Sequence, residues 1–381
     1  MTRREIRFGV IGGGMMGREL ASASARWCHL LDLEFMPRIV GLCDTNPTMF
    51  RWFQLNFPDI IVTTDYRELL ERRDIEAIYC AVPHHLHAEV YRAVIETGKH
   101  LLGEKPFGID REANRFILES IRAHPDVMVR CSSEFPFFPA AQQIICLISD
   151  DRFGRVIEVE AGFYHSGDLD PQKRINWKRR VEYNGQYGCM GDLGMHVLHI
   201  PLRFGWCPDE IFACLSNIVM SRPDEKGEEA PCCTWDNATL VGQVPRDGYR
   251  FPLLLSTKRI VPGEMNTWFI RILGTDLSAE FSTKFPKQLR TLPYASGQSQ
   301  AWHVTDMGYD SRYPVITGSI FEFGFSDAIL QMWAAFCDEL VNGRDGMKQP
   351  FYCVTPEETA VSHQLLTSAL ESHRRRAAVE V

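Results

Sequence analysis

Short apolar runs alternate with helical segments through the first third of the chain. The apolar runs are residues 8–11, 39–44, 75–82, 100–103 and 127–131, and the helical segments between them are residues 18–26, 86–97 and 109–123. Short apolar runs are typical of buried strands, and their alternation with helices predicts a parallel sheet with helices on both faces. Such sheets bind their ligands at the carboxyl ends of the strands.

The pattern changes near Ser132. The sequence EFPFFP at residues 134–139 breaks the alternation, and a helical segment at residues 140–148 follows. We then expect strands at residues 155–164, 210–219, 236–244, 251–257, 267–274 and 277–282, and closing helices at residues 326–341 and 356–376. These longer strands predict a mainly antiparallel sheet with one face available to a partner subunit. The polar segment 221–233 is expected to be a mobile loop.

The first apolar run ends in a glycine-rich segment with the spacing G-x-G-x-x-G on Gly12, Gly14 and Gly17. In a dinucleotide-binding turn, the first glycine permits a tight turn and the second lets the backbone approach a pyrophosphate. The third lets the helix pack closely on the strand. The free N–H groups of the helix start would then hold the phosphates. We therefore assign these three glycines to a cofactor site, with Met15 and Met16 in the same turn.

The second apolar run ends at Asp44, where a dinucleotide-binding fold places the carboxylate that hydrogen-bonds the adenosine ribose. A 2′-phosphate would meet a like charge there, and Thr45 and Asn46 offer no compensating arginine, so we expect NAD rather than NADP. Asp44 lies farther from the glycines than usual because of an apolar insertion at Trp27–Met36. The insertion either lines a substrate pocket or extends the helix and its packing.

These features predict an α/β protein of two domains in a chain of 381 residues. Residues 1–132 are expected to form a Rossmann dinucleotide-binding domain. Residues 133–381 are expected to form an α+β domain with a large, mainly antiparallel, open-faced sheet, which binds substrate and mediates oligomerisation.

The composition is that of a globular protein, with 45% apolar and 24% charged residues. The net charge of −8 argues against nucleic acid as the main partner. The sequence contains no apolar run of ~18 residues, and its N-terminus enters a strand without a signal-peptide core. We therefore expect a cytoplasmic protein that does not bind membranes. The twelve cysteines form no C-x-x-C pair, and no metal is expected.

Two polar segments follow strands of the predicted parallel sheet. The first is PHHLH at residues 83–87, whose histidine spacing gives no preformed set of metal ligands. We interpret it as a loop over the nicotinamide end of the cofactor, with contacts from Pro83 and His87. The second contains Glu104 and Lys105 followed by proline, and it holds the lysine rigidly near the cofactor. A structural salt bridge between these two residues is the alternative interpretation.

Asp192, His196 and His199 would lie on one face of a helix that begins near Cys189. A carboxylate one turn before a histidine can orient its ring, while the imidazole exchanges a proton with substrate near neutral pH. A satisfied buried pair is an equally good interpretation, and Asp-x-x-x-His-x-x-His could also bind a single metal ion.

A basic run at residues 173–180 surrounds Trp177 just before this segment. One interpretation is a solvated loop. The other is a lid, or a contact with an acidic sugar.

Three motifs in order closely resemble the glucose-fructose oxidoreductase, inositol dehydrogenase and rhizopine-catabolism (Gfo/Idh/MocA) family. They are VIGGGMMG, AVPHHLHAEVYRAVIETGKHLLGEKPFG and GDLGMHVLH. The resemblance covers residues 5–205, and from residue 206 onward it rests on the sheet-like pattern. It implies a Rossmann domain followed by an open-faced sheet used in oligomerisation, here in a homodimer or homotetramer. It also implies NAD(P)-dependent oxidation of a hydroxyl group of a sugar, cyclitol or related polyol.

By the same resemblance, Lys105 matches the lysine of the family's E-K-P motif, Asp192 its substrate-orienting acid and His196 its general acid/base. The resemblance also implies a cis Lys105–Pro106 bond. Two departures from the family pattern concern the substrate pocket and leave the cofactor assignment unchanged. Residues 133–136 read Ser-Glu-Phe-Pro where many members have Asn-Arg-Arg/Tyr-Phe, and His199 stands where an aspartate is common.

We therefore predict a dehydrogenase in which His196 takes the hydroxyl proton as a hydride leaves the same carbon for the nicotinamide. Lys105 polarises the oxygen and keeps His196 neutral, and Asp192 positions ring and substrate. Substrate contacts are assigned to Lys105, Trp177, Asp192, His196 and His199. Two alternatives remain. One is an enzyme that cleaves or eliminates a glycosidic bond through transient NAD oxidation. The other is a non-catalytic dinucleotide-sensing regulator, against which the three catalytic candidates argue.

Overall fold

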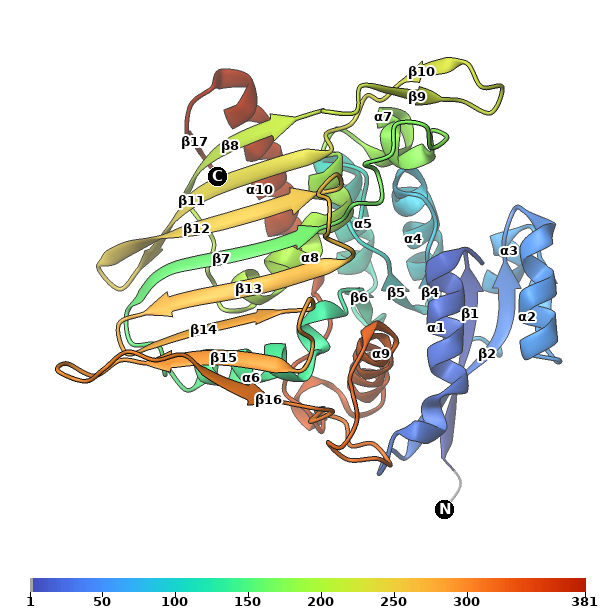
Figure 1. Cartoon of the computed structure of the whole chain (residues 1–381). Coiled ribbons are helices and arrows are strands. Elements are labelled where there is room, and N and C mark those ends of the chain that lie inside the picture. The colour runs from blue at the N-terminus through green and yellow to red at the C-terminus, as the bar shows by residue number, and fades with distance from the viewer. Residues whose placement is uncertain (1–2) are drawn as a thin grey trace.

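The computed structural model of the protein describes residues 3–381 and contains two large sheets (Figure 1). The first sheet is parallel throughout and has the strand order β3-β2-β1-β4-β5-β6. Its strands are β1 (Arg4–Ile11), β2 (Phe35–Cys43), β3 (Ile61–Thr63), β4 (Ala77–Cys80), β5 (His100–Gly103) and β6 (Val129–Cys131). Since the strand order reverses between β1 and β4, a crevice opens at the carboxyl ends of these two strands.

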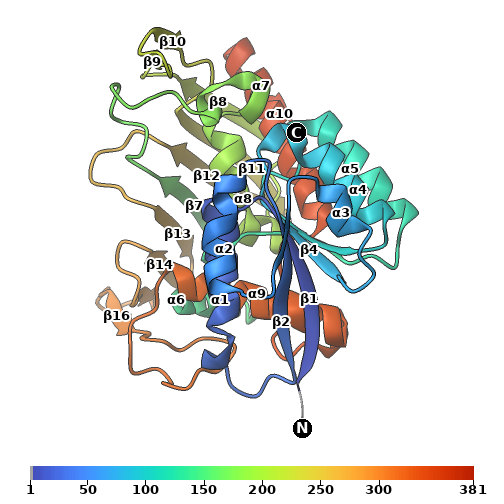
Figure 2. The same ribbon diagram turned by 90° about the vertical axis from the view of Figure 1, so that its right-hand side faces the viewer.

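Helices cover both faces of this sheet, as the apolar runs predict. Figure 2 shows α1 and α2 on one side and α3, α4 and α5 on the other. Their bounds are α1 (Met15–Ala25), α2 (Phe50–Asn56), α3 (Tyr66–Leu70), α4 (His87–Glu96) and α5 (Arg111–Ala123), with 3-10 turns η1 (Trp27–His29), η2 (Pro47–Met49) and η3 (His84–Leu86). The Rossmann fold of the N-terminal part is therefore confirmed.

Helix α9 (Phe325–Asn342) comes from the C-terminal part of the chain, yet it packs on the N-terminal sheet. Its Trp333 ring meets the Phe8 ring of β1 at 5.3 Å between centroids and the Trp27 ring at 6.1 Å. The predicted boundary after residue 132 therefore marks a change of sequence pattern, whereas the hydrophobic core is shared across it. Trp27, Leu30, Leu33 and Phe35 of the Trp27–Met36 insertion are buried in this core, which favours packing over a place in the substrate pocket.

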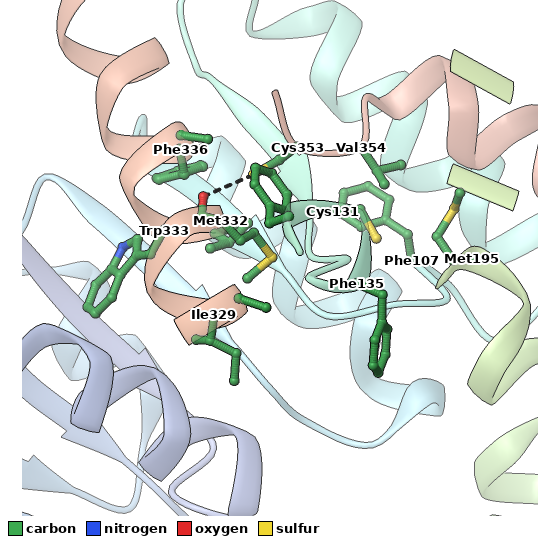
Figure 3. Close-up of a cluster of buried hydrophobic side chains, with 14 of the residues drawn as sticks. Phe107, Cys131, Phe135, Met195, Ile329, Met332, Trp333, Phe336, Cys353 and Val354 are labelled. Atoms are coloured by element: carbon green, nitrogen blue, oxygen red, sulfur yellow. Dashed lines mark hydrogen bonds between the residues drawn. The ribbon is translucent and has the colours of Figure 1, made fainter. Parts of the chain in front are cut away.

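Figure 3 shows how α9 joins the two parts of the chain. Ile329, Met332, Trp333 and Phe336 project from α9 into a cluster with Phe107, Cys131, Phe135, Met195, Cys353 and Val354. Burial of these apolar side chains stabilises the contact between the parallel sheet and the C-terminal part.

The second sheet has nine strands in the order β16-β15-β14-β13-β7-β12-β11-β8-β17, and only β7 and β12 pair in parallel. The predicted mainly antiparallel sheet is thus confirmed. Its strands are β7 (Val156–Tyr164), β8 (Glu210–Ser216), β11 (Asn237–Arg246), β12 (Tyr249–Lys258), β13 (Thr267–Gly274), β14 (Leu277–Ser282), β15 (Gln288–Pro293), β16 (His303–Asp306) and β17 (Val379–Glu380).

Helices cover the inner face of the second sheet. They are α8 (Cys189–Arg203) and α10 (Pro356–Arg375), with α6 (Pro139–Ser149) near β14 and β15. In Figure 1 the opposite face carries no helix of residues 3–381. Short helical turns complete the chain: η4 (Phe135–Phe137), η5 (Trp177–Arg179), α7 (Val181–Asn184) and η6 (Arg344–Gly346).

The expected loop at residues 221–233 is wrong, because this segment folds back on itself as a hairpin. Strand β9 (Ser221–Pro223) pairs antiparallel with β10 (Glu229–Pro231), and Arg222 is buried against the backbone oxygen of Asp168. None of the helices within residues 3–381 combines the length and the apolar character that a bilayer crossing needs.

Candidate active site

The glycine turn has the geometry that its spacing predicts. Gly12 has φ +101°, and a Cβ atom there would lie 2.6 Å from the Ala81 backbone oxygen. Gly17 packs so tightly that its Cβ would lie 2.0 Å from the Gly12 oxygen, whereas a Cβ on Gly14 would meet nothing within 4 Å. Gly12 therefore permits the tight turn, Gly14 leaves open space for a ligand, and Gly17 permits the close packing of the helix.

Asp44 follows β2 and faces the same space. One carboxylate oxygen accepts a hydrogen bond from the backbone N–H of Gly13 (2.7 Å), and the other accepts one from Asn46 N–H (2.8 Å). These bonds fix the carboxylate beside the glycine turn, where a ribose could reach it.

One cavity of about 550 Å³ connects the glycine turn with helix α8. The predicted residues that line it are Gly12, Gly14, Met15, Met16, Asp44, Pro83, Glu104, Lys105, Trp177 and Asp192. It is also lined by residues that sequence reasoning did not assign, among them Thr45, Thr64, His84 and Lys178. The structure thus brings most of the proposed cofactor and substrate residues together around one space, whereas Gly17, His87, His196 and His199 do not line it.

Asp192 is buried at the inner end of this cavity and is surrounded by cations. Lys105, which precedes a cis bond to Pro106, donates from Nζ to the Asp192 backbone oxygen (2.6 Å) and to Oδ1 (3.0 Å). Lys178 Nζ lies 3.0 and 3.1 Å from the two carboxylate oxygens, and Arg259 donates to Oδ2. The cis bond agrees with the expectation from the family resemblance.

These contacts set the charge states of the cluster. Burial opposes ionisation of Asp192, but Lys105, Lys178 and Arg259 hold its pKa well below its usual range. Burial lowers the pKa of Lys178 to about 8, although Asp192 opposes the shift. Burial opposes the charge of Lys105, but the attraction of Asp192 and Glu104 together outweighs burial and raises the pKa of Lys105.

His196 is buried next to this cluster, between the rings of Phe135 and Phe163. Burial first, and then the charge of Lys105, lower the pKa of His196 well below its usual value, so the ring is neutral at neutral pH. Its Nδ1 lies 3.3 Å from Ser133 Oγ, and its Nε2 makes no hydrogen bond with residues 3–381.

We predicted that the Asp192 carboxylate orients the His196 ring, but no hydrogen bond joins these two side chains within residues 3–381. The carboxylate of Asp192 is occupied by three cations, and the groups nearest His196 Nδ1 are the hydroxyl of Ser133 and the carboxyl of Glu134, at 3.8 Å. The side chains that orient the ring therefore belong to residues 133–136, the segment that departs from the family pattern.

Two predicted histidine contacts are not supported by the structure. His199 points away from the cavity, where its Nε2 lies 3.0 Å from Arg203 and its ring packs on Phe351. His87 is buried with both ring nitrogens occupied, by the Val82 carbonyl (3.1 Å) and the Gly108 N–H (3.3 Å). Both rings have structural partners, and neither lines the cavity.

The basic run divides between structure and site. Arg179 is fully buried in an ion pair with Asp236 (3.2 Å), whereas the adjacent Lys178 reaches into the cavity and Arg180 is half-buried. Successive side chains of this short turn point in different directions. The sequence pattern alone did not show which of these basic side chains faces the cavity. Within residues 3–381, no group of three His, Cys, Asp or Glu side chains is arranged to hold a metal ion.

Sequence reasoning missed three residues of the site. Lys178 lay in a basic run that suggested an acidic ligand, so a signal for it existed. Arg259 follows β12 without any local motif, and Glu134 was noted only as a departure from the family. Glu134 is buried, and burial together with Glu104 raises its pKa to about 8.

Comparisons with known proteins agree with this geometry. Residues 6–130 match a family described as "Oxidoreductase family, NAD-binding Rossmann fold". The match and the fold define an NAD-binding oxidoreductase. The matched N-terminal part of the chain is thus similar to the NAD-binding domain of the Gfo/Idh/MocA oxidoreductases.

Two relatives illustrate the similarity. Levoglucosan dehydrogenase of Pseudarthrobacter phenanthrenivorans is 24% identical over 225 residues, which span 59% of this chain and only 57% of that protein. A structure of levoglucosan dehydrogenase in complex with NADH and levoglucosan has a TM-score of 0.89 at 21% identity, over 99% of this chain and 100% of that one.

The third similar protein is an inositol dehydrogenase homologue of Azotobacter vinelandii in complex with NAD+. It has a TM-score of 0.82 at 20% identity, over 100% of this chain and 99% of that one. At these identities the two structures demonstrate a common fold.

Glu134 gives a pH-dependent prediction. The pKa of its carboxyl group is raised in the folded state, so the unfolded chain releases this proton at lower pH than the folded protein does. The free energy of unfolding of the wild type therefore falls as pH rises from about 4.5 to about 8. Glu134→Gln removes this effect. We expect the variant to gain on the order of 1–3 kcal/mol over wild type at pH 8 relative to pH 5, in urea unfolding. Parallel stability curves for the two proteins would contradict the buried-acid assignment.

Proposed function

We propose that this protein is an NAD-dependent dehydrogenase that oxidises a hydroxyl group of a sugar, cyclitol or related polyol. The observation that carries the proposal is the single cavity shared by the glycine turn, Lys105 and Asp192. NAD, held by the Gly12–Gly17 turn and by Asp44, would supply the hydride acceptor. The levoglucosan dehydrogenase and inositol dehydrogenase homologue described above support this substrate class.

His196 is the proposed proton acceptor. We place the ring proton on Nδ1, from which it is donated to Ser133 Oγ, so that the lone pair of Nε2 is free to take the hydroxyl proton of the substrate. Burial and the charge of Lys105 keep the ring neutral before the reaction. Lys105 polarises the substrate oxygen, and Asp192 holds Lys105 in place.

His196→Ala tests the proton transfer. We expect kcat to fall by about 10²- to 10⁴-fold with the affinity for NADH unchanged, because His196 is not among the residues that line the cavity. The measurements are steady-state rates on an active sugar or polyol and NADH binding by fluorescence. His303→Ala, at an exposed position on β16, is the matched control and should match wild type. Full turnover in His196→Ala would remove this residue from the mechanism.

Asp44→Ser tests the choice of cofactor. The serine removes the negative charge that would repel a 2′-phosphate, so we expect the preference for NAD over NADP to fall about tenfold or more. The ratio of dissociation constants for the two cofactors measures the preference. Asp59→Ser, whose carboxylate is 91% exposed, controls for net charge. An unchanged ratio in Asp44→Ser would show that another feature selects the cofactor.

We also propose that the open face of the nine-stranded sheet joins copies of the chain in a homodimer or homotetramer. Phe212, Val241 and Leu254 lie side by side on β8, β11 and β12, with Val241 in register with both others. Phe212 and Val241 are 39% and 38% exposed in the single chain. An apolar row on an uncovered sheet face favours contact with another protein surface.

Val241→Lys tests this interface. A buried lysine without a partner opposes association, so we expect the particle mass from light scattering to fall from the dimer or tetramer to the monomer. Ile320→Lys, at an apolar position that is 80% exposed outside the sheet, should keep the wild-type mass. A monomeric wild type, or a Val241→Lys protein of wild-type mass, would refute the proposed interface.

A further inference from the structure

We propose that the substrate carries a carboxylate group and that Lys178 is the residue that selects it. This inference rests on the proposed dehydrogenase function, because it names the substrate class of the same site. It replaces the idea that the whole basic run contacts an acidic sugar, since the run's Arg179 is buried in an ion pair with Asp236.

Two ammonium groups in the cavity retain hydrogen-bonding capacity. Lys105 Nζ makes two hydrogen bonds, both to Asp192, and Lys178 Nζ also makes two, to the two carboxylate oxygens of Asp192. An ammonium group has three N–H donors, so each lysine has one donor without a partner among residues 3–381. Both lysines line the cavity, and 29% of the Lys178 side chain is exposed to it or to solvent.

The protein does not balance the charge of this site. Two carboxylates, Asp168 and Asp192, are shared by the basic side chains of Lys105, Lys178, Arg222 and Arg259. Glu104 on the cavity wall supplies a third negative charge, which still leaves one positive charge in excess. Glu134, with its pKa near 8, is mostly uncharged at neutral pH.

A carboxylate on the substrate matches both features. It accepts hydrogen bonds from the free donors and neutralises the excess charge, and charge-assisted bonds of this kind are stronger than neutral ones. A neutral hydroxyl group uses the same donors but leaves the charge uncompensated in a desolvated site. Lys105 is committed to the reacting hydroxyl in the proposed mechanism, so Lys178 is the residue available for the carboxylate.

Paired ligands test the inference. The probes are D-glucuronate and D-gluconate against the neutral D-glucose and D-glucuronamide, and each is measured with NAD for turnover and with the NADH-loaded protein for binding by calorimetry. We expect wild type to prefer at least one of the acids over its neutral counterparts by about tenfold or more, in kcat/KM or in Kd. Lys178→Met should weaken that acid about 10- to 100-fold more than it weakens the neutral ligands.

Two further variants serve as controls. Lys178→Arg retains the positive charge and should recover most of the preference for acids, which separates charge from simple loss of fold. Lys173→Met removes an exposed lysine of the same segment, whose Nζ donates to the Gly167 oxygen, and should behave as wild type.

The outcomes distinguish this inference from the proposed function. Acids that bind through Lys178 without any NADH being formed would support the carboxylate site and contradict the dehydrogenase. Neutral sugars that are oxidised while neither acid is preferred would overturn the carboxylate site and leave the dehydrogenase standing. Equal losses for acidic and neutral ligands in Lys178→Met would also overturn it.

Discussion

The buried carboxylate of Asp192 is the constraint on which the active site depends. A charge in this position is costly unless it is paired, and it is paired three times, by Lys105, Lys178 and Arg259. These cations come from the end of strand β5, from turn η5 and from the end of β12. Since β5 belongs to the parallel sheet and β12 to the antiparallel sheet, the ion cluster fixes the two sheets against each other at the cavity.

The same pairing divides the chemical work among the residues. Asp192 is fully engaged with cations, so it cannot also orient the ring of His196, and Ser133 takes over that role. In the proposed mechanism Lys105 polarises a substrate oxygen, and burial together with the charge of Lys105 keeps His196 neutral so that it is able to accept a proton. Glu134 lies next to the ring but contributes little negative charge at neutral pH, because burial raises the pKa of its carboxyl group.

Local patterns predicted much of this structure. The glycine spacing at Gly12–Gly17, the strand-end residues Asp44 and Lys105, and the helix that carries Asp192 all depend on neighbours within a few residues. Most strands of the two sheets followed from hydrophobic patterns of the same short range, whereas the short strands β3, β16 and β17 and strand β15 were not predicted.

The features that were missed depend on contacts between distant segments. Arg259 reaches Asp192 from 67 positions away along the chain, and α9 covers a sheet built from the opposite end of the sequence. His199 occupies the helix face that periodicity assigned to it, but Arg203 and Phe351 occupy its ring there. The pattern of a single sequence does not show which distant side chain pairs with a given buried polar group.

The central claim is that NAD is a reactant whose hydride stays on the cofactor at the end of each turnover. The most direct measurement is the amount of NADH formed, by its absorbance, against the amount of oxidised product from the same reaction, by mass spectrometry, for sugars, polyols and sugar acids. The account predicts one NADH for each oxidised product. A cleaved or eliminated product without accumulated NADH, or bound NAD without any product, would contradict it.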